Sequence, residues 1–264
     1  MHHPAAQLHT ATVDQPAGVR DRYGRTIDYL RVSVIDHCNL RCVYCMPLSG
    51  SPHAASRNLL TPGEIERVVR AAAGLGFRKI RVTGGEPTLR ADLVEIVERI
   101  AGVDGIADVS LTTNGVLLPR MIDDLVSAGL TRVNLHIDSL NPERYRRVMR
   151  LGSLADARRG LEAVVRAGLF PIKINCVVTR GYNEADVVEL AGLTRDQDCH
   201  VRFIELMPLG GGECARIARD RFVPTAETRA RIEAAHGPLA ALPCYRASDE
   251  SENFKLAGGR GVVG

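Results

Sequence analysis

The chain has 264 residues, which is enough for one large domain or two small ones. Apolar residues make up 45% of it and charged residues 25%, a balance typical of a folded globular protein and not of a disordered one. A net charge of +3 and an aromatic content of 4% are too low to favour a nucleic-acid-binding protein.

Three features of the sequence indicate the cellular compartment of the protein. No apolar run approaches the roughly 18 residues of a membrane-spanning helix, and the N-terminus lacks the apolar core of a secretory signal. The seven cysteines are an odd number, and three are clustered, which favours a reducing compartment over a disulfide framework. We therefore expect a cytoplasmic protein without a membrane partner. Its oligomeric state stays open, with a homodimer as one alternative.

The first 22 residues mix Ala, Gln, Thr, His and Pro without a period, so residues 1–22 are predicted to be a flexible arm. Residues 29–35 alternate between apolar and polar side chains and are rich in β-branched types, which predicts a strand. This strand leads directly into a loop where Cys38, Cys42 and Cys45 are separated by four and three positions.

The cysteine loop offers three sulfur ligands, whereas a structural zinc site needs four ligands. Thiolates are the usual ligands of [4Fe–4S] clusters, and three thiolates would leave the fourth iron open to a small molecule. Ligand type therefore favours a [4Fe–4S] cluster on Cys38, Cys42 and Cys45. His37 lies next to Cys38 and could complete a zinc shell, so zinc remains the alternative.

Beyond the loop, strands and helices alternate. Thr61-Pro62-Gly63-Glu64 is a capping box with proline at the first helical position, and it predicts the start of a helix. Further strands are predicted at 79–83, 107–112, 132–137, 171–178 and 200–206, and further helices at 90–100, 119–128, 141–147, 155–167, 184–196 and 225–235.

Six strands followed by helices predict parallel strands joined by right-handed crossovers. Six units are fewer than the eight of a closed TIM barrel. The expected fold is therefore α/β, an open (βα)6 partial TIM-like barrel over residues 23–240.

Ligands of parallel α/β proteins bind at the carboxyl ends of the strands. Here each predicted end is polar, glycine-bearing or metal-ligating. Gly84-Gly85-Glu86-Pro87 lets backbone approach a ligand, because glycine has no Cβ, and its carbonyls and Glu86 could accept from a protonated amine. Alone, this segment is equally compatible with a plain β–α turn. The other ends are the cysteine loop and residues 112–115, 136–139, 175–178 and 205–208.

The cysteine spacing, followed by Met46-Pro47, resembles the cluster loop of the radical S-adenosylmethionine (SAM) superfamily. In that superfamily the open iron binds the amino and carboxylate groups of SAM, and an electron then cleaves SAM to a 5′-deoxyadenosyl radical. From about residue 23 to 264 the chain further resembles the GTP 3′,8-cyclase family of molybdenum cofactor biosynthesis. The segments that carry this resemblance are 30–34, 79–87, 111–115, 173–175 and 201–208.

The resemblance implies a [4Fe–4S] cluster and SAM as cofactors. It implies no catalytic side chain, because the cofactor supplies the radical and the protein positions and shields the reactants. His136 departs from the family, which often has serine there, and it either hydrogen-bonds SAM or only packs. The residues implied to bind SAM are Tyr44, Gly84, Gly85, Glu86, Thr112, Asn114, His136 and Met207.

Five basic residues lie on or beside predicted strands. Charged side chains inside strands are costly to bury unpaired, which favours an anionic ligand over edge positions. Arginine also suits bidentate contacts with phosphate. The resemblance implies GTP as substrate, abstraction of its ribose 3′ hydrogen, attack of that carbon on guanine C8, and a reductant as partner. The residues implied to bind GTP are Arg31, Lys79, Arg81, Lys173 and Arg202.

The family continues into a C-terminal segment with three more cysteines and a second [4Fe–4S] cluster. This chain stops where that segment should begin, so residues 241–264 are predicted to be the start of a truncated segment. A second cluster is expected only if the segment exists. Cys176, Cys199, Cys214 and Cys244 are dispersed, and we expect them to be buried or incidental thiols.

Two alternative functions stay open. One is another radical SAM reaction, for example on a peptide, against which the basic strand residues argue. The other is a non-enzymatic, zinc-stabilised binding module.

Overall fold

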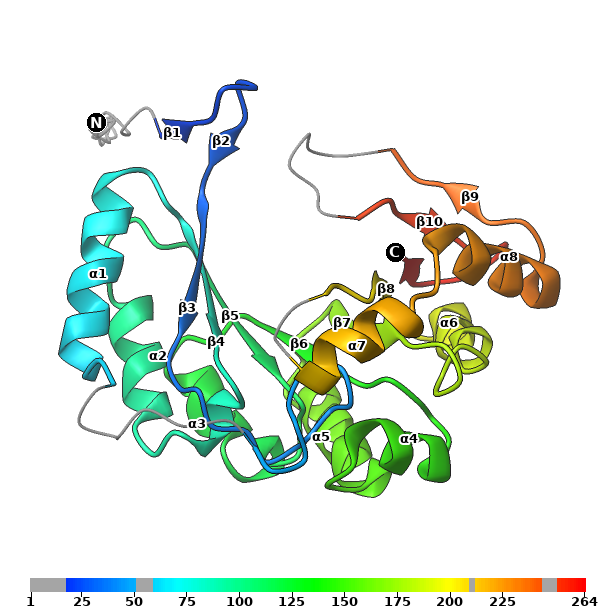
Figure 1. Ribbon diagram of the computed structural model, residues 1–264. Coiled ribbons are helices and arrows are strands. Elements are labelled where there is room, and N and C mark those ends of the chain that lie inside the picture. The colour runs from blue at the N-terminus through cyan, green and yellow to red at the C-terminus, as the bar shows by residue number, and fades with distance from the viewer. Residues whose placement is uncertain (1–17, 51–58, 209–211, 244–250) are drawn as a thin grey trace, which may run out of the picture.

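The computed structural model describes residues 18–50, 59–208, 212–243 and 251–264. In these parts of the chain a nine-stranded sheet has the order β3-β4-β5-β6-β7-β8-β11-β10-β9, and helices cover its outer side (Figure 1). Strands β3 to β8 are parallel neighbours in chain order. The predicted fold class, an α/β partial barrel of six strand–helix units, is confirmed.

The six parallel strands are β3 (Tyr29–Ser33), β4 (Lys79–Thr83), β5 (Asp108–Thr113), β6 (Arg132–His136), β7 (Ile172–Val178) and β8 (Cys199–Glu205). The helices are α1 (Pro62–Gly74), α2 (Leu93–Ala101), α3 (Ile122–Ser127), α4 (Pro142–Met149), α5 (Leu154–Arg166), α6 (Val187–Asp196), α7 (Gly212–Asp220) and α8 (Thr225–His236). Two short 3₁₀ turns, Pro87–Leu89 and Leu118–Arg120, precede α2 and α3.

The two faces of the sheet differ in polarity. Along β7, Ile172, Ile174 and Cys176 are buried against the helices, while the alternate residues Lys173 and Asn175 are only half-buried. Strands of parallel sheets that are buried on both faces usually form continuous apolar runs. The period of two seen here therefore leaves the concave face lined by polar groups.

Helix starts follow the local signals in the sequence. The Thr61 hydroxyl accepts from the Glu64 amide at 3.3 Å, and the Glu64 carboxylate accepts from the Thr61 amide at 2.8 Å, so the predicted capping box is confirmed. The Asn141 side chain likewise accepts from the amides of Glu143 and Arg144 at the start of α4.

Several boundaries differ from the prediction. Helix α2 starts at Leu93, after the 3₁₀ turn, and α6 starts at Val187. Helix α7 was not predicted, because its buried side, Cys214, Ile217 and Ala218, is too short a stripe to identify from sequence. Within the predicted arm, residues 1–17 lie outside the described part of the chain. Its end is a strand: β1 (Val19–Arg20) pairs with β2 (Thr26–Ile27).

The sheet continues beyond residue 240. Strand β11 (Val262–Val263) pairs in parallel with β8, and β10 (Phe254–Lys255) links it to β9 (Ala240–Ala241). The Phe203 amide also donates to the Gly264 carbonyl at 2.8 Å. The last residues therefore extend the sheet at its β8 edge. Across the described residues, every helix is too short or too polar to cross a bilayer.

Candidate functional site

The cysteine loop lies against the turn that follows β4. The Gly85 amide donates to the Ile35 carbonyl at 2.6 Å, and the Glu86 amide donates to the His37 carbonyl at 2.7 Å. A Cβ on Gly84 would lie 2.4 Å from the Ile35 carbonyl oxygen, and one on Gly85 would lie 2.2 Å from that of His37. We expected these glycines to let backbone approach a ligand. The close approach that they permit in the structure is to the strand end leading into the cysteine loop.

The Glu86 carboxylate accepts hydrogen bonds from within the chain, a structural role that the sequence analysis did not predict. Glu86 is 1% exposed, and its carboxylate accepts from the Thr88 amide and hydroxyl, the Thr113 hydroxyl and the Asn114 amide. Three of these four donors reach Oε1 and one reaches Oε2, so Oε2 keeps a lone pair for the expected protonated amine. Because buried carboxylates need such donors, Glu86 fixes the turn after β4 to the end of β5.

One more strand end and the end of one helix hold the loop. The Asn114 side-chain amide donates to the Asn39 side-chain oxygen at 2.7 Å, which connects the end of β5 to the loop. The amides of Arg41 and Val43 donate to the carbonyls of Met149 and Val148, at 3.1 and 3.0 Å. The three cysteines are therefore presented by a loop whose backbone is fixed from β4, β5 and α4.

The cysteines lie in one tight turn. The amides of Cys45 and Met46 both donate to the Cys42 carbonyl, at 2.9 and 3.1 Å, and the Leu40 amide donates to the Cys38 sulfur at 3.4 Å. Cys38 and Cys42 are half-buried, and Cys45 is exposed. Burial raises the pKa of the Cys38 thiol to about 11 and also raises that of Cys45. Nearby positive charge, such as that of iron, favours the thiolates that bind it.

This donor set fits a cluster better than a single ion. Among the described residues, no three His, Cys, Asp or Glu side chains converge closely enough to enclose one metal ion. A tetrahedral zinc ion requires such convergence. A four-iron cube instead attaches each thiolate to its own iron, so the three sulfurs can lie farther apart. Cys38, Cys42 and Cys45 would hold such a cluster, and amide donation to sulfur of the kind seen at Cys38 tunes it.

A polar triad connects the cysteine loop to the end of β6. The Tyr44 hydroxyl donates to the Asp138 carboxylate at 2.6 Å, so the His136 Nε2–H donates to the Tyr44 oxygen, also at 2.6 Å. Burial alone would lower the pKa of His136, but the neighbouring Asp138 carboxylate holds this pKa well above its usual value. His136 is therefore held as a hydrogen-bond donor to Tyr44 beside the cysteine loop.

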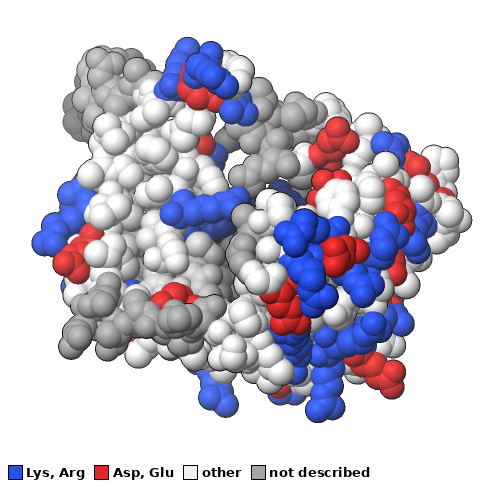
Figure 2. Space-filling model, in the orientation of Figure 1, with Lys and Arg blue, Asp and Glu red and all other residues white. Residues whose placement is uncertain are grey.

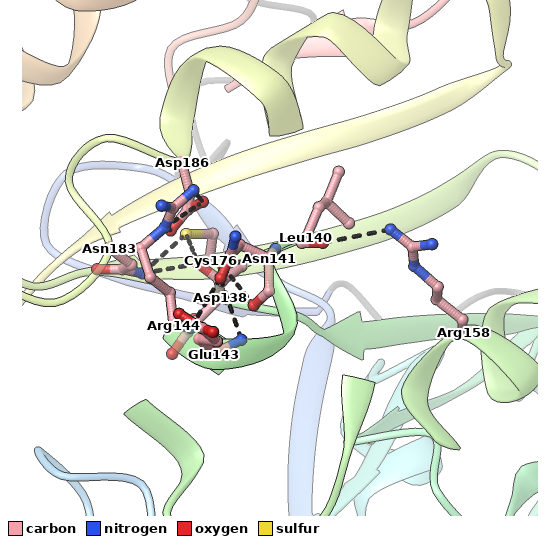
Figure 3. Close-up of polar contacts among 10 residues, drawn as sticks. Asp138, Leu140, Asn141, Glu143, Arg144, Arg158, Cys176, Asn183 and Asp186 are labelled. Atoms are coloured by element: carbon pink, nitrogen blue, oxygen red, sulfur yellow. Dashed lines mark hydrogen bonds and ion pairs between the residues drawn. The ribbon is translucent and has the colours of Figure 1, made fainter. Parts of the chain in front are cut away.

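Asp138 itself is rigidly held, and sequence reasoning did not single it out. It is 0% exposed, and its carboxylate also accepts from the Val177 amide at 2.8 Å. Its carbonyl accepts from the Asn183 side chain at 2.8 Å, and Cys176 contacts the same carbonyl (Figure 3). This network fixes the end of β6, and with it the position of Tyr44.

The polar concave face brings the predicted basic residues together. Strand register places Arg31 beside Arg81, and Lys173 beside His200, with Arg202 one step further along β8. Arg31 and Arg81 both lie over the Tyr29 ring, at 5.6 and 4.9 Å. The space-filling view shows the molecule hollowed between its β3 side and its α7 side, with basic side chains in the hollow (Figure 2).

Lys173 is repelled by the other cations of this basic group. Burial, and then the charges of Arg202, Arg132 and Arg81, lower the pKa of Lys173 to about 8. Burial and the same cationic surroundings lower the pKa of His200 to about 4. Lys79 differs, because its ammonium forms an ion pair with Asp28 at 2.7 Å.

Four residues of the concave face were missed by the sequence analysis. Arg132 pairs with Asp108, and the side-chain oxygens of Asn134 and Asn175 are buried without a hydrogen-bond partner. His200 faces Lys173 across the β7–β8 pair. The signal that could have identified them is alternation on β6, β7 and β8, where they share a face with Lys173 and Arg202.

The remaining predicted residues lie at the rim. Thr112 is half-buried beside Asn134 in the β5–β6 pair, and Met207 is 55% exposed beyond the end of β8. Of the dispersed cysteines, Cys176, Cys199 and Cys214 are buried, as expected, and Cys244 lies outside the described residues.

Sequence comparison identifies relatives over most of the chain. Residues 32–194 match the Radical SAM superfamily. A GTP 3′,8-cyclase of Pelotomaculum thermopropionicum is 46% identical over 246 residues, which are 93% of this chain and 75% of the relative. A GTP 3′,8-cyclase of Heliobacterium modesticaldum is 45% identical over 244 residues, which are 92% of this chain and 74% of that relative.

Solved structures support the fold alone. The Streptococcus suis protein SuiB bound to S-adenosylmethionine matches with a TM-score of 0.53 at 20% identity, over 67% of this chain and 40% of SuiB. TYW1 with a lysine–pyruvate adduct matches with a TM-score of 0.52 at 15% identity, over 82% of this chain and 76% of TYW1.

Substituting Gly85 by Ala tests the contact that holds the loop. The added Cβ overlaps the His37 carbonyl, so the strand end leading to Cys38 must shift. Anaerobically reconstituted wild-type chain should bind about four irons, and Gly85→Ala should bind less than half of that by iron and sulfide analysis. Gly63→Ala is the matched control, because a Cβ there meets nothing within 4 Å. Full iron loading of Gly85→Ala would contradict this role.

Proposed function

We propose that this chain, which belongs to the radical SAM superfamily and within it to the GTP 3′,8-cyclase family, converts GTP to 3′,8-cyclo-7,8-dihydro-GTP in molybdenum cofactor biosynthesis. Relatives at 40 to 46% identity carry the cyclase name. The single observation that carries the proposal is the juxtaposition of a three-cysteine loop with a group of mostly half-buried cations on one concave face.

The cysteine end of this face would hold the cofactors. Cys38, Cys42 and Cys45 would bind the [4Fe–4S] cluster, which with SAM supplies a carbon radical when both are bound. The carbonyls of Gly84 and Gly85 and the Glu86 carboxylate, whose Oε2 accepts one hydrogen bond within the chain, would accept from the SAM amine. His136, Tyr44, Thr112, Asn114 and Met207 are proposed to line the same ligand.

The basic part of the face would hold the triphosphate. Lys173, Arg81 and Arg202 repel one another while no anion is bound, and a triphosphate would relieve that repulsion. Arg31 and Lys79 are proposed to extend the same contacts toward β3. These side chains would orient the ribose toward the cysteine loop.

The remaining expectations stay proposals. We place the chain in the cytoplasm, which the free cysteines of the described residues support, and we expect a reductant that supplies electrons and no nucleic-acid partner. A second cluster is proposed only for a chain that carries the additional cysteines of the family.

Anaerobic incubation of the reconstituted chain with SAM, dithionite and GTP tests the function. The expected products are 5′-deoxyadenosine and a cyclised nucleotide, measured by chromatography and mass spectrometry. Cys42→Ala should abolish both, whereas Cys199→Ala, which removes a buried thiol remote from the loop, should retain both. Deoxyadenosine formed at the same rate without GTP, or no cyclised nucleotide, would contradict the proposal.

Affinity for GTP should fall as the pH rises above 8. The Lys173 pKa is about 8 because of burial and its cationic neighbours, so the free protein loses this charge there. Bound triphosphate restores the proton, and the dissociation constant should rise by up to about tenfold per pH unit. Calorimetry in two buffers of different ionisation enthalpy should show proton uptake at pH 8.5. Lys173→Arg keeps its charge at this pH and should abolish the uptake. Equal uptake by both proteins would contradict this assignment.

His136→Ala should weaken SAM binding and leave the cluster absorbance unchanged. The imidazole is removed, while Tyr44 keeps its hydrogen bond to Asp138, so the cysteine loop stays in place. Equilibrium dialysis with SAM and the visible spectrum measure the two effects. Tyr44→Phe serves as the comparison, because it removes the hydroxyl that holds His136. Unchanged SAM affinity in His136→Ala would show that the residue only packs.

A further inference from the structure

One surface outside the concave face has a net positive charge larger than that of the whole chain. Residues 142–166, which form α4, α5 and their connection, contain seven arginines and three acidic residues. Their surplus of four charges exceeds the +3 of the entire chain. Basic side chains gather on the side of the molecule that carries α4, α5 and α7 (Figure 2). Such an asymmetry indicates an acidic partner.

Some of these arginines are already neutralised. Arg144 pairs with the buried Asp186, Arg150 pairs with Glu213 at 2.9 Å, and Arg159 pairs with Asp156. Within the described residues, Arg146 and Arg158 form no ion pair; Arg158 donates to the Leu140 carbonyl at 3.2 Å (Figure 3). The charge of these two residues is therefore available to a partner.

Arg146 and Arg158 line a recess together with the apolar residues Leu151, Leu154 and Ala155. The recess has a volume of about 690 Å³, and its lining also includes Glu143, Arg150 and Gly152. Leu151 is 41% exposed in it. We call this surface the basic recess. Protein interfaces combine an apolar centre with arginine in this way, whereas a site for a small anion alone has no use for the leucine.

The basic recess shares its wall with the cysteine loop. Met149, directly before Arg150, contacts Cys42 through their sulfur atoms at 3.3 Å. A Cβ on Gly152, whose φ is +82°, would lie 2.7 Å from Leu40. The same short segment therefore lines the recess on one side and packs against the cluster-binding loop on the other.

We propose that the basic recess is the docking surface of the reductant, an acidic protein that carries single electrons on a flavin or an iron–sulfur centre. This proposal rests on the proposed function, which requires a reductant. One electron is transferred, with the carrier oxidised and the centre held by the cysteine loop reduced. Docking at the recess brings the carrier to the outer side of that loop and leaves the concave face to SAM and GTP.

The size and charge of the surface suit a transient complex. Electron-transfer interfaces are small, often below about 1,200 Å², and they depend on opposite charge for fast encounter. Long-range attraction of this kind weakens as salt screens it. An acidic carrier should therefore bind the basic recess weakly, rapidly and with strong dependence on ionic strength.

The test uses a flavodoxin, an acidic flavin-bearing carrier, with the reconstituted chain. Arg146→Glu/Arg158→Glu should weaken flavodoxin binding about tenfold at low ionic strength, as measured by calorimetry, and should slow flavodoxin-driven deoxyadenosine formation. Formation driven by dithionite, which needs no docking, should be unchanged. Arg146→Gln/Arg158→Gln should give an intermediate loss. Arg166→Glu is the control for charge reversal outside the recess, because it reverses the charge of one arginine in the last turn of α5, remote from the recess.

The possible outcomes separate the two proposals. Equal flavodoxin affinity in the wild type and the double variant would overturn the docking surface, as would an equal loss in Arg166→Glu. A parallel loss of the dithionite-driven rate would also overturn it, because the arginines would then act on the cysteine loop itself. If the wild type makes no deoxyadenosine even with dithionite, the proposed function fails, while the binding measurement still decides whether an acidic carrier docks.

Discussion

The whole site depends on the contact between two stretches of backbone, the strand end that leads to the cysteines and the glycine turn after β4. At Gly84 and Gly85 the chain approaches the carbonyls of Ile35 and His37 so closely that no side chain fits between them. Two short hydrogen bonds then fix the strand end in place. Since a cluster needs three sulfurs at defined separations, a loop with freedom to move would lose binding free energy in ordering them.

Around that contact, buried polar groups form hydrogen bonds with the cysteine loop and with one another. Glu86 connects the glycine turn to β5, Asn114 connects β5 to the loop, and Tyr44 connects the loop to Asp138 at the end of β6. Each of these groups is expensive to bury unless its partners are present. The strand ends therefore form one hydrogen-bonded unit, and the four hydrogen bonds to the Glu86 carboxylate belong to it.

The concave face has the opposite character, because cationic side chains of neighbouring strands lie close together there. Lys173, Arg202 and Arg81 lie near one another at an energetic cost, as the lowered pKa of Lys173 shows. A fold tolerates such a cost where a ligand offsets it. Outside the barrel, Arg144 of α4 pairs with Asp186 at the start of α6, whereas Arg146 of the same helix forms no ion pair within the described residues and lines the basic recess.

The sequence alone determined the order of the six parallel strands and of the helices other than α7, the fold class, the three cysteines and the basic strand residues, because each depends on local spacing or residue type. Even the capping box of α1 could be identified within four residues. Tertiary structure decided the rest. Strand register decided which groups hydrogen-bond to Glu86 and that Asp138 accepts from Tyr44. It also decided which residues lie beside Lys173 on the concave face, namely Arg132, Asn134 and His200. Register brings residues together that are far apart in the chain, and no local pattern specifies it.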